Sequence, residues 1–136
     1  MAYWLMKTEP LEYGYHHLEQ AGRDVWDGVK NFAALKNLKS MRSGDLAFVY
    51  HTGKEKSMVG VAEIISQPYP DPKDNHLYLV DLRPLYCLHR PVSLAEIKQD
   101  PAFSGWELVR LPRLSVMPVL PEHWSRIHAL AGNPLS

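Results

Sequence analysis

LAFVYHTGKEKSMVGVAEIIS, residues 46–66, contains two apolar runs that flank a polar loop. The runs span Leu46–His51 and Met58–Ser66, and the loop Thr52–Ser57 is short enough to join them as a β-hairpin. Strands joined in this way are antiparallel, because parallel strands need a long crossover connection. This stretch therefore predicts the centre of an antiparallel sheet.

The segments on both sides of this hairpin predict further strands and a few helices. Apolar or aromatic runs predict extended segments at Tyr3–Lys7, Leu77–Leu85, Trp106–Leu111 and Leu114–Val119. Start and stop signals predict helices at Leu11–Gly22, Asn31–Met41, Leu94–Gln99 and Pro121–Gly132. No helix separates the three central strands, which argues against a parallel doubly wound sheet. The order predicts an α+β fold, with a curled antiparallel sheet or small barrel and flanking helices.

Composition and charge fit one globular domain over residues 1–136. Hydrophobic residues make up 46% of the chain and charged residues 22%, which is enough to bury an apolar core. Lys plus Arg and Asp plus Glu each number 15, so the formal net charge is zero. A neutral chain lacks the strong positive field of proteins that coat nucleic acid. Any contact with nucleic acid therefore has to be local.

Cysteine and histidine usage predicts neither a metal site nor a cofactor. Cys87 is the only cysteine, and His16 and His17 are adjacent, so they cannot both face one site from a helix. The chain has no Gly-x-Ser-x-Gly elbow and no glycine-rich phosphate loop, which are two common signals of catalysis. A single cysteine favours a reducing, cytoplasmic setting. No apolar run approaches the roughly 20 residues that span a bilayer, so we expect no membrane contact.

The motif Trp26-Asp27-Gly28-Val29-Lys30-Asn31 is the first candidate binding element. It places a large aromatic side chain at a glycine turn directly before a predicted helix. An indole offers a flat stacking face, and the N–H groups at a helix start offer donors to a polar ligand. Burial of Trp26 as a plain core residue is the alternative. The functional interpretation requires that the ring borders a cavity that admits a planar heterocycle.

Polar residues at strand ends are the other candidates. Lys7 and Thr8 suit contact with a phosphate and a base edge, although Thr8 also suits a cap of the turn into Pro10. His51 can border a pocket or serve as an ordinary hydrogen-bonded residue at a strand end. Arg113 and Ser115 alternate with an apolar residue and share one face of the late strand.

Taken together, several motifs resemble the EVE domain family over nearly the whole chain and in the family's order. They are Tyr3–Pro10, Trp26–Asn31, Gly44-Asp45 before a strand ending Tyr50-His51-Thr52, Val59–Glu63, Tyr69–Pro72 and Arg113–Val116. The resemblance implies a PUA-like fold, a small curled β-barrel with flanking helices, and a relation to YTH domains, which flip a methylated adenine into an aromatic cage. It also implies that the chain reads modified bases, notably modified cytosines in DNA, and is not an enzyme.

The resemblance carries site residues onto matching positions of this chain. Trp26 matches the family's pocket tryptophan, and the polar pocket positions match Lys7, Thr8, Asn31, His51, Thr52, Arg113 and Ser115. Residues 29–36, VKNFAALK, depart from the family's usual VRNYQARN by losing two arginines, a phenol and an amide. Lysine cannot reproduce the bidentate fork of arginine, so these changes weaken the expected contacts of this helix with phosphate or guanine.

The sequence therefore predicts a monomeric, single-domain module without cofactor or metal. Its expected partner is nucleic acid, DNA in preference to RNA, with one modified base, a 5-modified cytosine, flipped against Trp26. Lys7 and Arg113 are expected to hold phosphate or the base carbonyl, and Thr8, Asn31, His51 and Ser115 to read the polar edge. Two alternatives stay open: a nucleoside amidohydrolase-like enzyme that uses Lys7 and Glu9, and a protein-interaction module, which the neutral charge favours.

Overall fold

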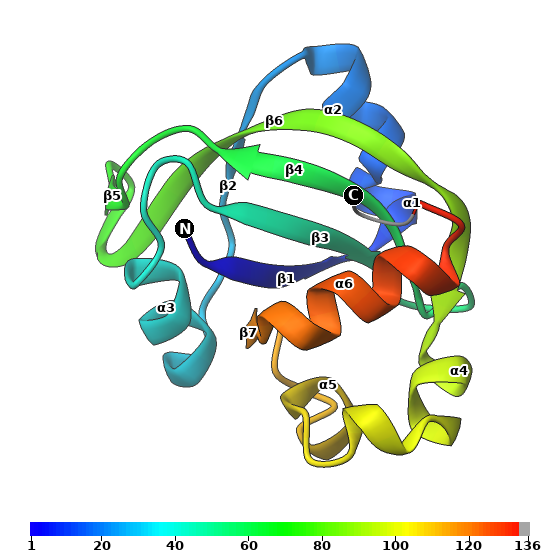
Figure 1. Cartoon of the computed structure of the whole chain (residues 1–136). Helices are drawn as coiled ribbons and strands as arrows, with labels where there is room; N and C mark the ends of the chain where they lie inside the picture. Colours follow the sequence, from blue (N-terminus) through cyan, green and yellow to red (C-terminus); the bar gives the residue numbers. More distant parts are fainter. Residues whose placement is uncertain (134–136) are drawn as a thin grey trace.

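The computed structural model describes residues 1–133 and forms one seven-stranded sheet flanked by helices (Figure 1). The strands are β1 Tyr3–Thr8, β2 Asp24–Trp26, β3 Leu46–His51, β4 Ser57–Ile64, β5 Tyr69–Asp71, β6 Asp74–Ser93 and β7 Val116–Val119. Their order across the sheet is β2-β6-β4-β3-β1-β7, and β5 pairs with β6. The predicted α+β class and the central hairpin are confirmed, because β3 and β4 pair in antiparallel fashion from Leu46 opposite Glu63.

The helices are short and lie around the sheet (Figure 1). They are α1 Pro10–Tyr13, α2 Tyr15–Ala21, α3 Phe32–Lys39, α4 Leu94–Gln99, the 3₁₀ helix η1 Pro101–Phe103, α5 Glu107–Arg110 and α6 Pro121–Leu130. On α6, Trp124 stacks on Tyr3 at 4.4 Å and lies 4.1 Å from the Phe48 ring, measured between ring centroids, which holds this helix against β1 and β3. Among residues 1–133, no helix has the length and apolar character needed to cross a bilayer.

The centre of the sheet differs from the prediction in one pairing. Strands β1 and β3 run parallel, with Tyr3 opposite Leu46 and Thr8 opposite His51. The segment between them holds α1, α2, β2 and α3, which is long enough for the crossover that a parallel pair requires. Parallel pairing brings the C-terminal ends of β1 and β3 together, and four of the polar residues predicted for the site, Lys7, Thr8, His51 and Thr52, lie at these two ends.

A closed barrel is not confirmed. Among residues 1–133 the sheet is an open path that begins at β2 and ends at β7, and no pairing joins these two strands. The curl comes from β6, a long curved strand that pairs with β2, β4 and β5 along its length (Figure 1).

Two predicted elements are wrong in detail. Residues 106–111 are not extended: Trp106 is the N-cap of α5, and its indole N–H donates to the Pro118 carbonyl at 3.0 Å. A four-residue helix is too short to show helical periodicity in the sequence. The helix predicted over 11–22 is broken at Gly14, whose extended backbone separates α1 from α2. A Cβ at Gly14 would lie 2.7 Å from the exposed His16 ring, which would have to turn aside to accommodate it.

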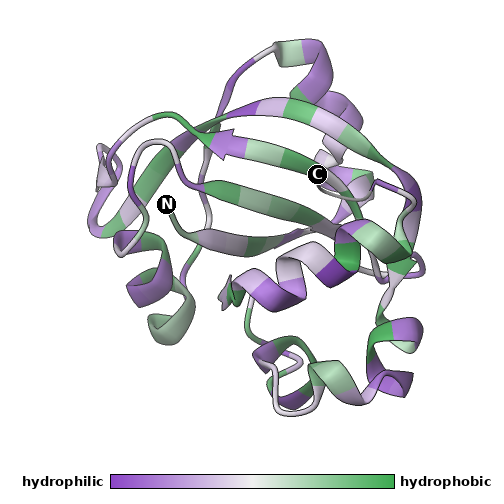
Figure 2. Cartoon of the chain, in the orientation of Figure 1, coloured by the Kyte–Doolittle hydropathy of each residue, from purple (hydrophilic) through white to green (hydrophobic). Residues whose placement is uncertain are grey.

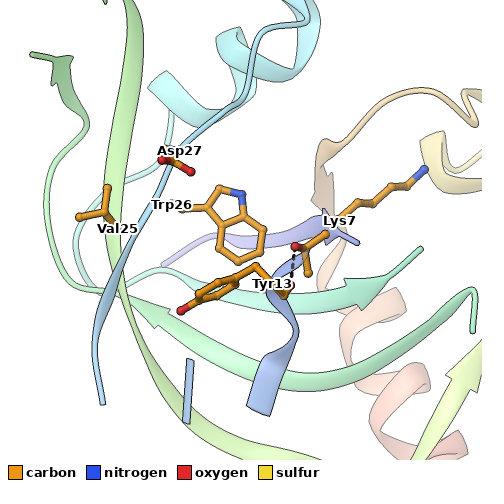
Figure 3. A pocket seen from close by; sticks show the side chains of 6 residues that line it. Lys7, Tyr13, Val25, Trp26 and Asp27 are labelled. Atoms are coloured by element: carbon orange, nitrogen blue, oxygen red, sulfur yellow. Dashed lines mark hydrogen bonds between the residues drawn. The ribbon is translucent and has the colours of Figure 1, made fainter. Parts of the chain in front are cut away.

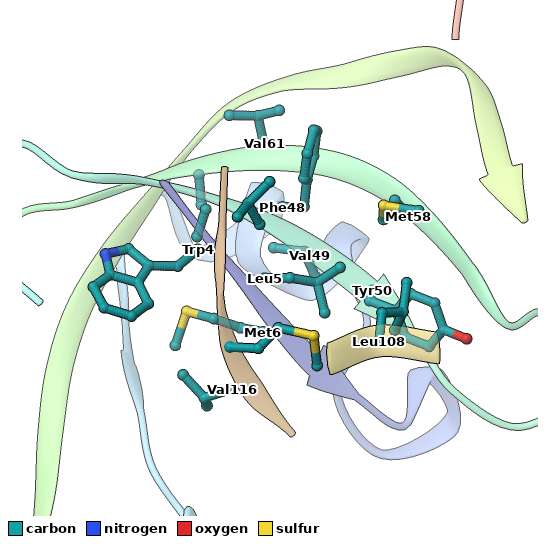
Figure 4. Close-up of a cluster of buried hydrophobic side chains, with 14 of the residues drawn as sticks. Trp4, Leu5, Met6, Phe48, Val49, Tyr50, Met58, Val61, Leu108 and Val116 are labelled. Carbon is teal, nitrogen blue, oxygen red and sulfur yellow. The ribbon is translucent and has the colours of Figure 1, made fainter. Parts of the chain in front are cut away.

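The core lies between the central strands and the helices (Figures 2 and 4). Apolar residues follow the inner strands, whereas polar residues gather on the outer helices and loops (Figure 2). Figure 4 shows Leu5 and Met6 of β1 packed among side chains of β3, β4 and β7. Trp4, Trp106 and Trp124 are buried in this core as well.

Candidate functional site

A cavity of about 150 Å³ opens where the ends of β1, α1 and β2 meet (Figure 3). Its lining residues are Lys7, Thr8, Tyr13, Val25, Trp26 and Asp27. Trp26 ends β2, opposite Val80 of β6, and the turn that follows depends on Gly28, whose φ of +74° suits glycine. The turn leads directly to the start of α3.

The aromatic wall of this cavity is a pair of rings. Trp26 is only 7% exposed, so most of the indole is buried and its remaining surface borders the cavity. The Tyr13 ring meets it edge-on, at 6.4 Å between centroids and 85° between planes. The Tyr13 hydroxyl donates to Asp24 Oδ2 at 2.6 Å, which fixes the phenol ring. Burial and this carboxylate raise the pKa of Tyr13 well above its usual value, so the phenol is neutral.

Lys7 and Thr8 border the cavity but point in different directions, as neighbours on a strand do. The Thr8 hydroxyl donates to the Tyr13 carbonyl at 2.6 Å and thereby closes α1. The Lys7 side chain extends away from Trp26 (Figure 3). Its Nζ donates to the Pro112 carbonyl at 2.9 Å and lies 5.6 Å from the centre of the Tyr50 ring. Burial lowers the pKa of Lys7.

His51 and Thr52 lie outside the lining of this cavity. Nε2 of the buried His51 accepts the Tyr15 N–H at 3.0 Å, so Nδ1 carries the proton and donates to Glu55 at 3.0 Å. With both ring nitrogens bonded, His51 fixes the start of α2 to the end of β3. The N–H of Thr52 donates to the Thr8 carbonyl at 2.9 Å, which joins the ends of β1 and β3.

Asn31 and Arg113 come together in a different hollow of about 370 Å³, next to α3. The Asn31 side chain accepts the Ala34 N–H at 3.0 Å and caps this helix, as its position before the helix predicts. Arg113 is exposed there. Ser115 is half-buried, and its carbonyl accepts the Lys7 N–H at 2.9 Å.

The structure therefore joins three of the predicted residues, Lys7, Thr8 and Trp26, in one cavity. Sequence reasoning missed Tyr13, Val25 and Asp27. Asp27 follows Trp26 directly in the quoted motif, so its proximity was available from the sequence. Tyr13 lies in a segment with a weak helical pattern, and nothing in that pattern indicated that its ring would meet the Trp26 ring.

The chemistry of the lining suits a flat polar ligand. The two aromatic side chains offer apolar contact, and the exposed Asp27 carboxylate offers an acceptor at the rim. Lys7 and Glu9, the pair considered for hydrolysis, are bonded elsewhere: Glu9 accepts from the Leu11 N–H at 3.3 Å and the Thr52 hydroxyl at 3.4 Å. Within residues 1–133, no three His, Cys, Asp or Glu side chains are grouped as metal ligands.

Comparison with known proteins identifies the family of this chain. The family model of the EVE domain matches residues 2–130. The solution structure of Rpa0253 from Rhodopseudomonas palustris is 38% identical, with a TM-score of 0.92 over 97% of this chain and 94% of that one. An uncharacterised protein of Schizosaccharomyces pombe is 31% identical over 85% of this chain, and the match spans 57% of that protein's length.

Thymocyte nuclear protein 1 of Homo sapiens is 28% identical over 95% of this chain and 73% of the human protein. A crystal structure of human THYN1 in complex with DNA that contains 5-methylcytosine matches with a TM-score of 0.87 at 26% identity. It covers 96% of this chain and 98% of that one.

Proposed function

This chain belongs to the EVE domain family, and from that membership we propose that it binds a modified base in the cavity beside Trp26. The base is a 5-modified cytosine in DNA, turned out of the duplex. The observation that carries this proposal is that Trp26 borders a cavity that also has a second aromatic ring, that of Tyr13, and polar groups at its rim. The human relative solved with 5-methylcytosine DNA supports the choice of ligand.

The residues around the cavity suit a cytosine ring. Contact with the exposed part of Trp26 and with Tyr13 supplies stacking, which is worth roughly 1–3 kcal/mol per base. The carboxylate of Asp27 is an acceptor of the kind that pairs with the exocyclic amine of cytosine. Extruding a base costs a few kcal/mol, comparable to the stacking gain, so small differences between bases decide occupancy.

Titration of matched duplexes tests this function. Three duplexes that differ only in one cytosine, 5-methylcytosine or 5-hydroxymethylcytosine are titrated against the wild type, Trp26→Ala and Trp26→Phe. We expect the wild type to prefer a modified duplex, Trp26→Ala to lose tenfold or more in affinity for it, and Trp26→Phe to lose less because it keeps a ring. Asp27→Ala is expected to lower the affinity for all three duplexes, because each carries the exocyclic amine that the Asp27 carboxylate accepts from.

Trp4→Phe is the matched control, because Trp4 and Trp26 are each 7% exposed but only Trp26 borders the cavity. It is expected to lose stability without changing the preference among duplexes. The melting temperature of each variant, compared with that of the wild type, shows whether a loss of affinity comes from a loss of folded structure. Equal affinity of the wild type for all three duplexes would overturn the proposal.

We also propose that the chain acts as a binding module and not as a hydrolase. Lys7 and Glu9 form no hydrogen bond or ion pair with each other within the described residues, and each is held by other groups. Incubation with acylated cytidine is expected to release no deacylated product. A monomeric state and a cytoplasmic setting stay predictions, which sizing of the purified protein and imaging of a tagged chain test.

A further inference from the structure

A second hollow, of about 290 Å³, lies between the ends of β1 and β3 and the helices α4 and α5. Lys7 lines both this hollow and the Trp26 cavity, so the two spaces adjoin at this residue. Its ammonium group, which extends away from Trp26 in Figure 3, lies next to Tyr50 and Pro112 of the second hollow.

The lining of this hollow is cationic. Lys7, Lys56 and Lys98 contribute to it, and no Asp or Glu does. Within residues 1–133, none of these lysines forms an ion pair with a carboxylate. Three unpaired cations around one concave space attract an anion, even though the whole chain is neutral.

The acidic residues near this hollow are engaged elsewhere. Glu55 pairs with His51 at 3.0 Å, and Glu96 of α4 pairs with Arg90 at 2.7 Å. The Glu9 carboxylate lies beside Gly53 of the lining and accepts hydrogen bonds from the Leu11 N–H and the Thr52 hydroxyl. With Glu9 counted, the three lysines still leave the lining and this edge with a net positive charge.

Backbone contacts hold the parts of this lining together. The Leu94 N–H donates to the Lys56 carbonyl at 2.8 Å, which joins the start of α4 to the loop after β3. The hollow also has apolar walls, including Leu94 and Leu108, that suit the carbon face of a sugar. A cationic rim with an apolar wall fits a sugar-phosphate unit better than a free metal ion or an apolar peptide.

We propose that this hollow binds a backbone phosphate next to the base that enters the Trp26 cavity. The inference rests on the proposed function and extends it. Base and phosphate of one nucleotide are joined through one sugar, and the two spaces share Lys7 in their lining, so one strand can reach both. The base cavity then supplies selectivity for the modification, whereas the lysine hollow supplies affinity that does not depend on the base.

Two exposed lysines allow a test that leaves the base cavity intact. Lys56→Gln and Lys98→Gln are combined in one variant and compared with the wild type on modified and unmodified duplexes over a series of salt concentrations. We expect the variant to lose about tenfold in affinity at low salt for both duplexes, with the ratio between them unchanged. The slope of log affinity against log salt is expected to become shallower by about 1, as for loss of one phosphate contact.

Lys73→Gln is the matched control, because Lys73 is also exposed but lies in the turn between β5 and β6, away from the hollow. It is expected to leave affinity and slope unchanged, and equal melting temperatures exclude loss of fold. If the wild type selects the modified duplex but the double variant keeps its affinity and slope, the phosphate site is overturned. If the wild type binds all duplexes equally while the double variant still loses slope, the base-reading function fails and the phosphate site stands.

A titration with inorganic phosphate separates a backbone phosphate from a free one. We expect weak phosphate binding that competes with the duplex in the wild type and is lost in the double variant. Tight phosphate binding by the wild type, together with DNA affinity that is insensitive to both lysines, would assign the hollow to a free phosphorylated ligand and overturn the backbone assignment.

Discussion

At the scale of single residues, His128 of α6 is a buried histidine whose protonation state follows from its contacts. Nδ1 lies 2.8 Å from the Trp124 carbonyl and must donate to it, so Nε2 accepts the Tyr86 hydroxyl proton at 2.9 Å. The ring packs between Phe48 and Trp124, with centroid distances of 5.3 and 5.0 Å. Burial lowers the pKa of His128 from its usual value of 6.5, which keeps the folded state neutral at this position.

This histidine predicts a loss of stability in mild acid. The His128 ring is protonated near pH 6.5 in the unfolded chain but only at lower pH in the folded chain. The contribution of His128 to stability is therefore complete above that pH and is lost as the pH falls below it. Urea unfolding at pH 8 and pH 5.5 measures this loss. In His128→Phe the difference between the two pH values is expected to shrink, and a difference equal to that of the wild type would contradict the prediction. The other histidines contribute equally to the pH dependence of both proteins. Their contribution therefore cancels when the difference between pH 8 and pH 5.5 in His128→Phe is compared with that in the wild type.

At the scale of elements, the start of α3 depends on one side chain that the sequence also placed in the site. Asn31 caps the helix through the Ala34 N–H, and loss of such a cap costs about 1 kcal/mol. Asn31→Ala is therefore expected to lower the free energy of unfolding by about 1 kcal/mol, and Asn31→Ser by much less, because serine caps as well as asparagine. Urea titration of both variants measures the effect.

The same two variants separate capping from ligand contact. Asn31→Ser keeps the cap and removes the amide. If capping is the only role of Asn31, this variant is expected to bind a modified duplex with unchanged affinity. Lower affinity without lower stability would show that the amide contacts the nucleic acid, as the family resemblance implies. Equal loss of stability in both variants would contradict the cap itself.

At the scale of the whole molecule, Asp45 ties the start of β1 to the turn before β3. It is 4% exposed, and its Oδ2 accepts from the Trp4 indole at 3.0 Å and the Arg42 N–H at 2.9 Å, while Oδ1 accepts the Ala2 N–H at 3.0 Å. These bonds support the parallel pairing at the centre of the sheet. Asp45→Asn places an NH₂ donor against an N–H donor, and such a buried mismatch is expected to cost about 1–3 kcal/mol.

Thermal and urea unfolding of Asp45→Asn measure this cost. Glu12→Gln is the control, since it makes the same chemical change on an exposed side chain. It is expected to leave the stability within about 0.5 kcal/mol of the wild type. Equal stability of Asp45→Asn and the wild type would show that this tie does not hold β1 in the sheet.

Features that depend on neighbouring residues along the chain could be predicted from the sequence. The β3–β4 hairpin followed from two apolar runs and a short loop, and the start of α3 followed from Asn31 before its apolar repeat. Trp26 and Asp27 were adjacent in a recognisable motif. Alternation, helical period, capping and turn residues act over a few positions, so these features are visible in a linear sequence.

The contacts between distant segments could be seen only in the folded structure. It placed β1 parallel to β3, bent β6 so that one strand pairs with three others, and set Tyr13 against Trp26. It also placed Lys7 in one hollow with Lys56 and Lys98, and enclosed His51 between Tyr15 and Glu55. These outcomes depend on the shared burial of residues far apart in the chain, which no local pattern encodes.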